Sequence, residues 1–387
     1  MKLNYLMPTR ILMGENCIIE QRNLFSGLGK KAFIVTGKKS ARINGAYDDV
    51  AEALKANGQD YELYDRVTAN PTDACVIEAG KMARETGCDF VFGIGGGSPM
   101  DAAKAVAILA LNDISKEEMF TLSFKKVLPV VDVPTTAGTG SETTPYSVLV
   151  ETTEADGMTP KSGGPAKRSI GSPLLFPQFA FLDAKYTKSL NRDITVNTAI
   201  DALSHALEGM LTLRANYLSN VLAKDSTALI MDCLDALLAF PDDPFSFPLE
   251  IREKLLLSSS IAGMVISQSG TAAPHSMGYQ FTLNWGTDHG RANGLLMKSF
   301  LSWCREKENA VHKSDPSFAP RIPGICAALK MDLEKFFEIL EKLLGKREKA
   351  SEAELTKWSS LPMKNALNTY IQPDKKEIER IFRESVG

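Results

Sequence analysis

Residues 88–111, CDFVFGIGGGSPMDAAKAVAILAL, combine a short apolar run, a glycine-rich turn and a longer run with helical periodicity. The first run, residues 88–96, has the length and the aromatic and β-branched content of a buried strand. Residues 98–111 predict a helix that is capped by Ser98 and carries Asp101 in its first turn. A strand that passes directly into a helix is one half of a parallel βαβ unit.

The same alternation continues on both sides of this stretch. Strands are predicted at residues 30–37, 59–67 and 126–134, and helices at residues 46–58 and 71–87. Because strands and helices alternate along the chain, the predicted fold class is α/β with a parallel sheet.

The second half of the chain has a different secondary-structure pattern. From about Thr187 the strand signals stop, and long stretches of helical periodicity follow. At 387 residues the chain is long enough for two domains. We therefore predict an α/β domain over residues 1–186 and an all-helical domain over residues 187–387.

The composition narrows the class of protein. It is 44% apolar and 24% charged, which is typical of a globular protein, and the net charge of −3 gives no basic surface for nucleic acid or anionic membranes. Six cysteines are scattered without a CxxC pair, which favours a reducing compartment. The N-terminus lacks the apolar core of a signal peptide, and no apolar run is long enough to span a bilayer. These features predict a cytoplasmic protein.

Two loops suggest a nucleotide site in the first domain. Gly95, Gly96, Gly97 and Ser98 lie between a predicted strand and helix, where glycines and free amides suit a pyrophosphate. The match to G-x-G-x-x-G is imperfect, since Ser98 takes the last glycine position, and a tight turn without a ligand is the alternative. The loop 134–144, PTTAGTGSETT, also follows a strand. Ligands bind at the carboxyl ends of parallel strands, so the two loops together favour a nucleotide.

The segment Gly37-Lys38-Lys39-Ser40 bears on which nucleotide would bind. Enzymes that use NAD commonly hold the ribose 2′-hydroxyl with an acidic residue near such a strand end. Here a glycine, two lysines and a serine suit a 2′-phosphate better, which favours NADP over NAD. An ordinary basic turn is the alternative.

Histidine usage points to a metal site in the second domain. The chain has four histidines, and His205 lies four residues after Asp201, so both side chains emerge on one helix face. A hydrogen bond between the two is the plainer explanation for that pair alone. His275 follows Pro274 near a predicted helix start, and His289 precedes Gly290 before the next helix; each could be a core histidine. Taken together, one aspartate and three histidines predict a site for iron or zinc.

Five segments carry a resemblance to a known family. The chain resembles the iron-containing alcohol dehydrogenases (group III), and within them the butanol-dehydrogenase-like branch. The segments are GGGSPMDAAK (95–104), PTTAGTGSE (134–142), DALSHALEG (201–209), PHSMGYQ (274–280) and DHGRANG (288–294).

The resemblance implies a dehydroquinate synthase-like fold, with a dinucleotide-binding first domain and a metal-binding second domain. It implies that Asp201, His205, His275 and His289 bind Fe2+ or, alternatively, Zn2+. The cofactor-binding residues would be Gly37, Ser40, Asn70, Gly95, Gly96, Gly97, Ser98, Asp101, Thr135, Thr136, Thr139, Ser141, Thr144 and Lys167. Gly37 falls where members that prefer NAD often have an aspartate.

The chain departs from the family pattern at three places. Tyr279 stands where many relatives have an extra histidine four residues after the third ligand, so a tyrosine hydroxyl, a water or the cofactor ribose would relay the proton. The asparagine-proline-arginine element of the C-terminal region is replaced by NTYIQPDKKE. Tyr146 aligns beside the expected substrate pocket.

The expected function is reversible, metal-dependent hydride transfer between NADP (or NAD) and a primary alcohol or aldehyde such as butanol or butanal. No catalytic side chain is assigned beyond the metal ligands, with Tyr279 as a second-sphere candidate. The resemblance also implies a homodimer or larger homo-oligomer. The alternatives are a glycerol-type dehydrogenase, a dehydroquinate-synthase-like lyase and a non-catalytic nucleotide-binding protein.

Overall fold

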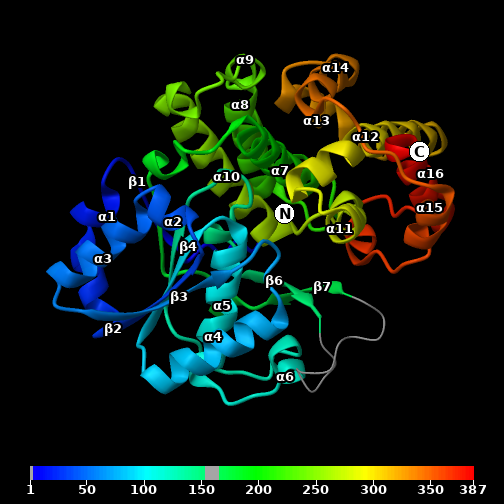
Figure 1. Cartoon of the computed structure of the whole chain (residues 1–387). Coiled ribbons are helices and arrows are strands. Elements are labelled where there is room, and N and C mark those ends of the chain that lie inside the picture. Colours follow the sequence, from blue (N-terminus) through cyan, green and yellow to red (C-terminus); the bar gives the residue numbers. More distant parts are fainter. Residues whose placement is uncertain (1–2, 153–164) are drawn as a thin grey trace. The chain divides into compact units, whose positions relative to one another are not determined.

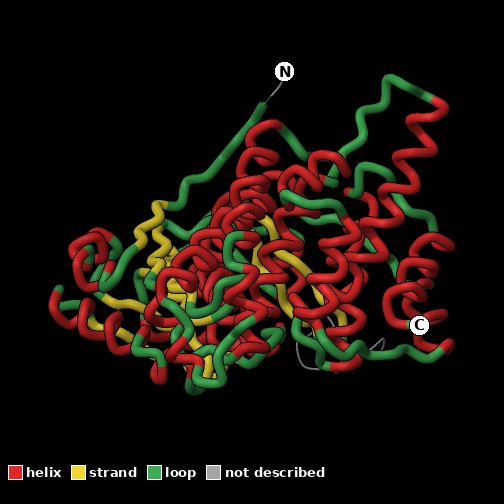
Figure 2. The backbone as a smooth tube through the Cα atoms, turned by 90° about the horizontal axis from the view of Figure 1, so that it is seen from above, coloured by secondary structure: helices red, strands yellow, loops and turns green. Residues whose placement is uncertain are grey.

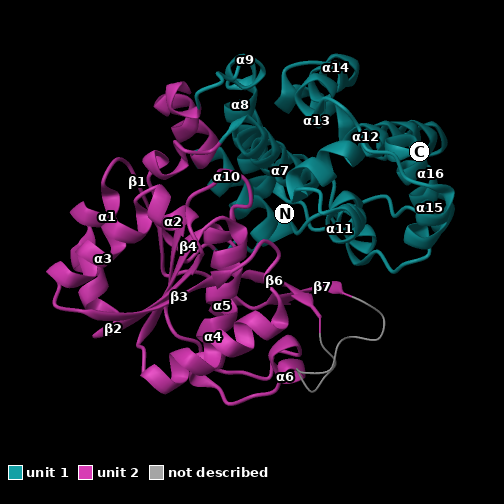
Figure 3. Ribbon diagram, viewed as in Figure 1, with its two compact units in different colours: residues 1–6, 191–243, 257–387 teal, residues 7–190, 244–256 magenta. Residues whose placement is uncertain are grey.

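The computed structural model describes residues 3–152 and 165–387. By the contacts between its residues the chain divides into two compact units (Figure 3). Unit 2 runs from Met7 to Leu190 and includes the later segment Pro244–Leu256. Unit 1 comprises the segment that ends at Leu6, Asn191–Asp243 and Leu257–Gly387.

Unit 2 is built on a six-stranded parallel sheet, which confirms the predicted fold class. The strand order is β1-β8-β5-β4-β2-β3. The strands are β1 (Arg10–Met13), β2 (Lys31–Gly37), β3 (Asp60–Val67), β4 (Phe90–Gly95), β5 (Val130–Pro134) and β8 (Phe179–Leu182). A separate antiparallel pair is formed by β6 (Tyr146–Glu151) and β7 (Ala166–Gly171).

Helices cover both faces of the parallel sheet (Figure 1). The helices and single turns of this unit are α1 (Cys17–Glu20), η1 (Arg22–Gly27), α2 (Ser40–Ile43), α3 (Ala46–Ala56), α4 (Asp73–Thr86), α5 (Gly97–Leu111), α6 (Lys116–Phe120), η2 (Ser141–Thr143), η3 (Pro173–Leu175), η4 (Ala184–Thr187) and η5 (Pro244–Ser246). Alternate residues of β2 point to opposite faces. Phe33 and Val35 pack with α4 and α5, whereas Ala32 and Ile34 pack with α1 and α3.

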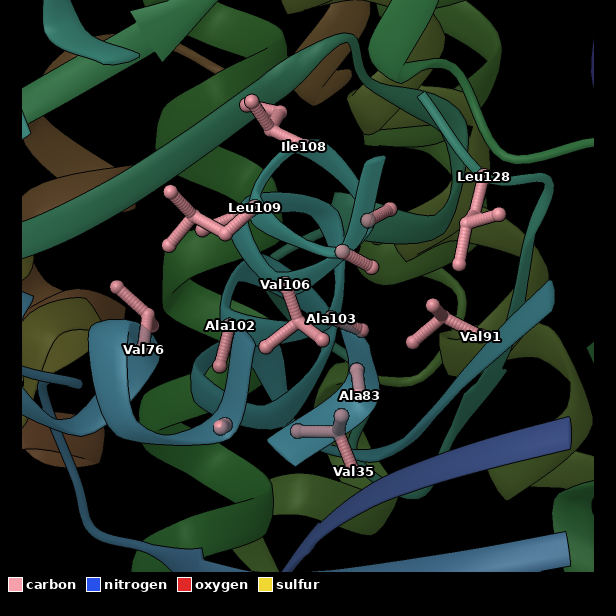
Figure 4. Close-up of a cluster of buried hydrophobic side chains, with 14 of the residues drawn as sticks. Val35, Val76, Ala83, Val91, Ala102, Ala103, Val106, Ile108, Leu109 and Leu128 are labelled. Carbon is pink, nitrogen blue, oxygen red and sulfur yellow. The ribbon is translucent and has the colours of Figure 1, made fainter. Parts of the chain in front are cut away.

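Helix α5, the apolar run that follows the glycine loop, is buried in the core beside the sheet. Val35 and Val91 from the sheet share one cluster with Ala102, Ala103 and Val106 of α5 (Figure 4). All five side chains are almost fully buried. Each buried valine of this kind stabilises the fold by roughly 1.5–3 kcal/mol, so the helix is fixed against the strand that precedes it.

The register of the parallel strands brings three loops to one edge of the sheet. Thr36 of β2 lies opposite Ile94 of β4, and Gly95 of β4 lies opposite Pro134 of β5. The segments that follow these strands, residues 37–40, 95–98 and 134–144, therefore start next to one another at the carboxyl edge. This is the edge at which open α/β sheets bind ligands.

Unit 1 is helical, as its periodicity predicts. All the strands formed by the described residues lie in unit 2, and the remaining tube in Figure 2 consists of helices and loops. The elements are α7 (Arg192–Met210), α8 (Tyr217–Met231), α9 (Leu234–Leu238), α10 (Leu249–Ser269, from Leu257 onward), α11 (Ala273–Trp285), α12 (His289–Ser314), α13 (Ile322–Leu329), α14 (Leu333–Leu344), α15 (Glu352–Ser359), η6 (Lys364–Asn368) and α16 (Lys375–Val386). Among the described residues, no helix is both long and apolar enough to cross a membrane.

Candidate metal and nucleotide sites

Helix α7 presents the first two candidate ligands. Asp201 and His205 lie one helical turn apart, and both are buried. The Oδ1 atom of Asp201 is 4.0 Å from the Nε2 atom of His205. This distance is too long for a hydrogen bond between the two atoms. The plainer explanation of this pair, a direct Asp–His hydrogen bond, is therefore not supported by these atoms.

Helix α11 adds His275 to this pair. Pro274 stands in the first turn of α11, where its missing N–H costs no helix hydrogen bond, and His275 follows it directly. One ligand atom from each of Asp201, His205 and His275 lies within 4.8 Å of the other two. A carboxylate and two imidazoles at this separation form a site that can hold a divalent metal ion.

His289, the first residue of α12, completes the group of three histidines. Its Nε2 atom is 4.0 Å from Oδ1 of Asp201, and its ring centroid is 5.1 Å from that of His275. Its side chain is 26% exposed, unlike those of the other three residues. The fourth histidine lies apart, because His312 is exposed near the end of α12 and its Nδ1 bonds the Phe318 carbonyl.

Glu208 touches this cluster, although the sequence analysis did not assign it a role. It lies on α7 three residues after His205, and its Oε1 atom is 2.7 Å from Nδ1 of His275. Its Oε2 atom accepts a hydrogen bond of 2.9 Å from the backbone N–H of Ala272. Burial raises the pKa of Glu208 to about 8, against the opposing effects of the Ala272 N–H and of His205. A divalent cation bound to the adjacent His275 would lower this pKa and favour the ionised carboxylate. The helical spacing of Asp201, His205 and Glu208 was the signal that could have revealed it.

Asn293 is the second residue that the sequence analysis missed. It is fully buried on α12, and its Nδ2 atom donates to Oδ1 of Asp201 at 3.0 Å. The same Nδ2 lies 3.3 Å from Nε2 of His275 and 3.4 Å from Nε2 of His289. The carboxylate and the imidazole nitrogens thus face a common point. This mixed oxygen and nitrogen donor set fits iron or zinc.

In unit 2, the glycine loop begins α5 differently from our expectation. The helix starts at Gly97 with Gly96 as its N-cap, and no side chain caps it. The predicted cap by Ser98 is wrong, because Ser98 is already inside the helix. Its hydroxyl instead accepts a hydrogen bond from the backbone N–H of Asn70 at 3.1 Å. First-turn amides without a side-chain cap suit an anionic ligand.

The two predicted nucleotide loops pack against each other. A Cβ on Gly96 would lie 3.2 Å from Oγ1 of Thr136, and a Cβ on Gly97 would lie 2.8 Å from Cγ2 of Thr139. The N–H of Thr135 donates to the carbonyl of Gly95 at 2.8 Å. Glycine is needed at position 97 because a larger residue would push the second loop away.

A buried lysine ties three further predicted residues together. Asp101 accepts a 2.6 Å hydrogen bond from the Ser141 hydroxyl. The Lys104 ammonium is fully buried and donates to the Ser141 hydroxyl at 2.7 Å and to the Tyr146 carbonyl at 3.0 Å. It also reaches Oγ1 of Thr144 at 3.4 Å. These contacts hold the second loop against α5.

Comparison with known proteins places this geometry in a family. Residues 8–184 match the model "Iron-containing alcohol dehydrogenase", and residues 195–386 match "Fe-containing alcohol dehydrogenase family, C-terminal". A solved iron-containing alcohol dehydrogenase is 36% identical, with a TM-score of 0.85 over 99% of both chains. The chain belongs to the iron-containing alcohol dehydrogenase family.

Two curated relatives from Escherichia coli K12 show the breadth of names in the iron-containing alcohol dehydrogenase family. The probable alcohol dehydrogenase EutG is 35% identical over 63% of this chain and 59% of its own length. The lactaldehyde reductase is 30% identical over 71% of this chain and 68% of its own length. The match to EutG thus spans less than two thirds of that relative.

Tyr279, the second-sphere candidate, lies on α11 beside His289. It lies one turn after His275 on α11, and its ring stacks on that of His289 with centroids 5.6 Å apart and planes at 29°. A flat aromatic neighbour fixes the plane of the His289 ring.

Gly37 and Ser40 lie where β2 ends at the carboxyl edge of the parallel sheet, whereas Lys167 lies on the separate β6–β7 pair. Gly37 ends β2, and a Cβ there would meet only the Val67 carbonyl oxygen at 3.4 Å and Oγ of Ser40 at 3.7 Å. Lys38 and Lys39 are exposed. Lys167 lies on β7, opposite Val150 of β6. The space at Gly37 admits a larger side chain, so its lack of a carboxylate is not forced by packing.

Proposed function

We propose that this protein catalyses reversible hydride transfer between a nicotinamide nucleotide and a primary alcohol or aldehyde, with butanol and butanal as the representative pair. The main support is the convergence of Asp201, His205 and His275, whose ligand atoms lie within 4.8 Å of one another. Membership of the iron-containing alcohol dehydrogenase family supports alcohol and aldehyde chemistry at these metal-binding side chains. We place the chain in the butanol-dehydrogenase-like branch on the motifs in its sequence.

Asp201, His205, His275 and His289 would hold Fe2+, with Zn2+ as the alternative. Such an ion, when bound, acts as a Lewis acid toward an alcohol or carbonyl oxygen. Asn293 orients the Asp201 carboxylate through its 3.0 Å hydrogen bond. Tyr279, which stacks on His289, is our candidate for carrying a proton beside the site.

The two loops of unit 2 would hold the nucleotide. Gly96, Gly97 and Ser98 would face the pyrophosphate at the first turn of α5, where amides and the helix dipole favour negative charge. The other proposed cofactor residues are Gly37, Ser40, Asn70, Gly95, Asp101, Thr135, Thr136, Thr139, Ser141, Thr144 and Lys167. Asp101, Ser141 and Thr144 would act by holding the second loop in place, since their polar atoms bind one another or Lys104.

We infer a preference for NADP over NAD. Gly37 offers no carboxylate to a ribose 2′-hydroxyl, and the exposed Lys38 and Lys39 would attract a 2′-phosphate. A carboxylate at position 37 would repel that phosphate. Packing does not require a glycine at position 37, which supports the interpretation that Gly37 is there because of the cofactor that binds.

The proposal is tested by nicotinamide oxidation with butanal, using protein purified without oxygen. NADPH and NADH are compared, each with Fe2+ supplied and after chelation. Metal-dependent turnover of NADPH is the expected result, and NADH preference would overturn only the cofactor inference. Bound metal without turnover of either nucleotide would reject butanal. Glycerol and other diols then test the glycerol-type alternative.

Two broader inferences accompany this function. The six cysteines are all free thiols, which suits a reducing compartment such as the cytoplasm. We also propose a homodimer or larger homo-oligomer, which sedimentation of the purified protein tests.

A further inference from the structure

We propose that Glu208 is the positioning residue that makes His275 a metal ligand through Nε2. The inference rests on the proposed metal site, and it concerns a residue for which that proposal assigns no role. Glu208 would act through His275, by fixing which ring nitrogen carries the proton and which way the ring faces.

The first argument is the contact between the carboxylate and the ring. Oε1 of Glu208 is 2.7 Å from Nδ1 of His275, and both side chains are about 95% buried. A carboxylate accepts hydrogen bonds, so Nδ1 of the neutral ring carries the proton and Nε2 keeps its lone pair. Nε2 also lies 3.3 Å from the Nδ2 donor of Asn293, which is consistent with an acceptor at that atom.

The second argument is that Glu208 is itself held in place. Its Oε2 atom accepts from the backbone N–H of Ala272, which is the N-cap residue of α11. One carboxylate from α7 therefore fixes both the start of α11 and the ring of His275 on the same helix. When ionised, Glu208 would also place its negative charge at the positive end of the α11 dipole, where it is favoured.

The third argument is that only a carboxylate satisfies both partners. The Ala272 N–H and the Nδ1–H of His275 are both donors, and the two oxygens of Glu208 accept one each. A glutamine has one oxygen and one amino group. If its amino group faced the ring, the His275 proton would move to Nε2 and occupy the lone pair that a metal requires. If it faced Ala272 instead, a buried N–H would lose its partner.

A buried glutamate elsewhere in unit 1 provides a matched control. Glu308 accepts hydrogen bonds from the backbone N–H groups of Arg321 and Ile322 and from the Tyr370 hydroxyl. It is as buried as Glu208, and none of these partners is a proposed ligand. Replacing it by glutamine perturbs a buried carboxylate without altering His275.

The experiment measures the Zn2+ dissociation constant of the full chain by competition with a chromophoric chelator. For Glu208→Gln we expect affinity to fall about 10- to 100-fold, as is typical when such a partner of a metal-bound histidine is lost. For Glu308→Gln we expect a lower melting temperature and a zinc affinity within about twofold of wild type. Equal zinc affinity in Glu208→Gln and wild type would overturn the inference and leave the metal site standing. A wild-type protein that binds neither Zn2+ nor Fe2+ would instead reject the proposed function.

A second measurement does not depend on whether the variant folds. In the metal-free wild-type protein labelled with 15N-histidine, where no metal occupies Nε2, the His275 ring should show its proton on Nδ1. A proton on Nε2 would mean that Glu208 does not set the tautomer, and the inference would fail. A purely structural role for Glu208 predicts no fixed tautomer.

Discussion

Gly290 on α12 lies against Asn197 on α7 so closely that a Cβ at position 290 would come 1.8 Å from the Asn197 carbonyl oxygen. The same Cβ would come 2.9 Å from Cβ of Asp201. This glycine therefore sets how closely α12 approaches α7, and with it the distance between His289 and Asp201. Gly290 follows the proposed ligand His289 in the sequence, and across the helix contact it lies against the proposed ligand Asp201.

Gly290→Ala is expected to weaken metal binding although alanine favours helices. Alanine gains about 1 kcal/mol over glycine in helix propensity. Here the clash forces α12 away from α7, and such overpacking costs about 1–3 kcal/mol. We expect a lower melting temperature and at least tenfold weaker zinc binding. Gly324→Ala on α13 is the control, because its Cβ would meet only Cε of Met210 at 3.5 Å. Unchanged zinc affinity in Gly290→Ala would show that this contact does not set the site.

Gly37→Asp is expected to shift the cofactor preference toward NAD. The nearest atoms to a Cβ at this position are at ordinary contact distance, so the substitution should not disturb the fold. A carboxylate beside the 2′-phosphate costs an expected ~1–3 kcal/mol, which is about a 5- to 150-fold loss in kcat/KM for NADPH. Gly37→Asn, which has nearly the same shape and no charge, should lose much less. An equal loss in both variants would point to sterics rather than charge.

His275→Ala is expected to abolish metal binding and turnover while the protein stays folded. The substitution removes one of three buried ligands whose donor atoms lie within 4.8 Å of one another. His312→Ala is the matched control, since His312 is exposed and bonds only a backbone carbonyl through the contact described above. Metal content by elemental analysis, circular dichroism and butanal turnover are measured together. Full turnover in His275→Ala would reject the proposed centre.

The parts of the fold that the sequence predicted are those with a strong local pattern. Strands β2, β4 and β5 are apolar runs next to periodic helices, and β3 alternates apolar and charged residues, whereas β1 and β8 have only four residues each and no such contrast. The return of Pro244–Leu256 to unit 2 depends on tertiary contacts, which helical periodicity does not encode. Serine at position 98 predicts a cap because serine favours that position, but the helix begins at Gly97 and the Ser98 hydroxyl accepts from the Asn70 N–H instead.

The candidate metal site also contains some residues that the sequence predicts and others that only the structure reveals. The four proposed ligands stood out because histidine is scarce in this chain and because Asp201 and His205 share a helix face. Glu208 lies three residues after His205, and Asn293 lies four residues after His289. This spacing places each of them on the same helix face as a proposed ligand. Glutamate and asparagine are, however, common on exposed helix surfaces, so the spacing alone does not indicate a role. Only their burial and their contacts separate them from such residues.

Asp132 gives a prediction about stability and pH. It lies on β5 directly opposite Gly93 of β4, and it is fully buried with no hydrogen-bond partner at either carboxylate oxygen. A Cβ on Gly93 would lie within 2.4 Å of its Oδ1, so the glycine makes room for this side chain. Burial raises the pKa of Asp132 well above its ordinary value; Lys104 opposes the shift, and Glu142 adds to it.

The direction of the pH effect follows from the raised pKa. Below about pH 3 the carboxyl is protonated in both the folded and the unfolded chain. As the pH rises further, the unfolded chain releases this proton while the folded protein keeps it. The folded state then binds more protons, so its free energy of unfolding falls by about 1.4 kcal/mol per pH unit until the folded carboxyl ionises.

Asp132→Asn isolates this contribution, because it keeps the size of the side chain and removes its titration. Denaturant unfolding of both proteins between pH 4.5 and 6.5 should show the variant gaining stability relative to wild type as the pH rises. Other titrating groups that behave alike in the two proteins cancel in the difference. If the difference stayed constant with pH, Asp132 would not be held neutral, and the buried lysine beside it would have to stabilise its charge.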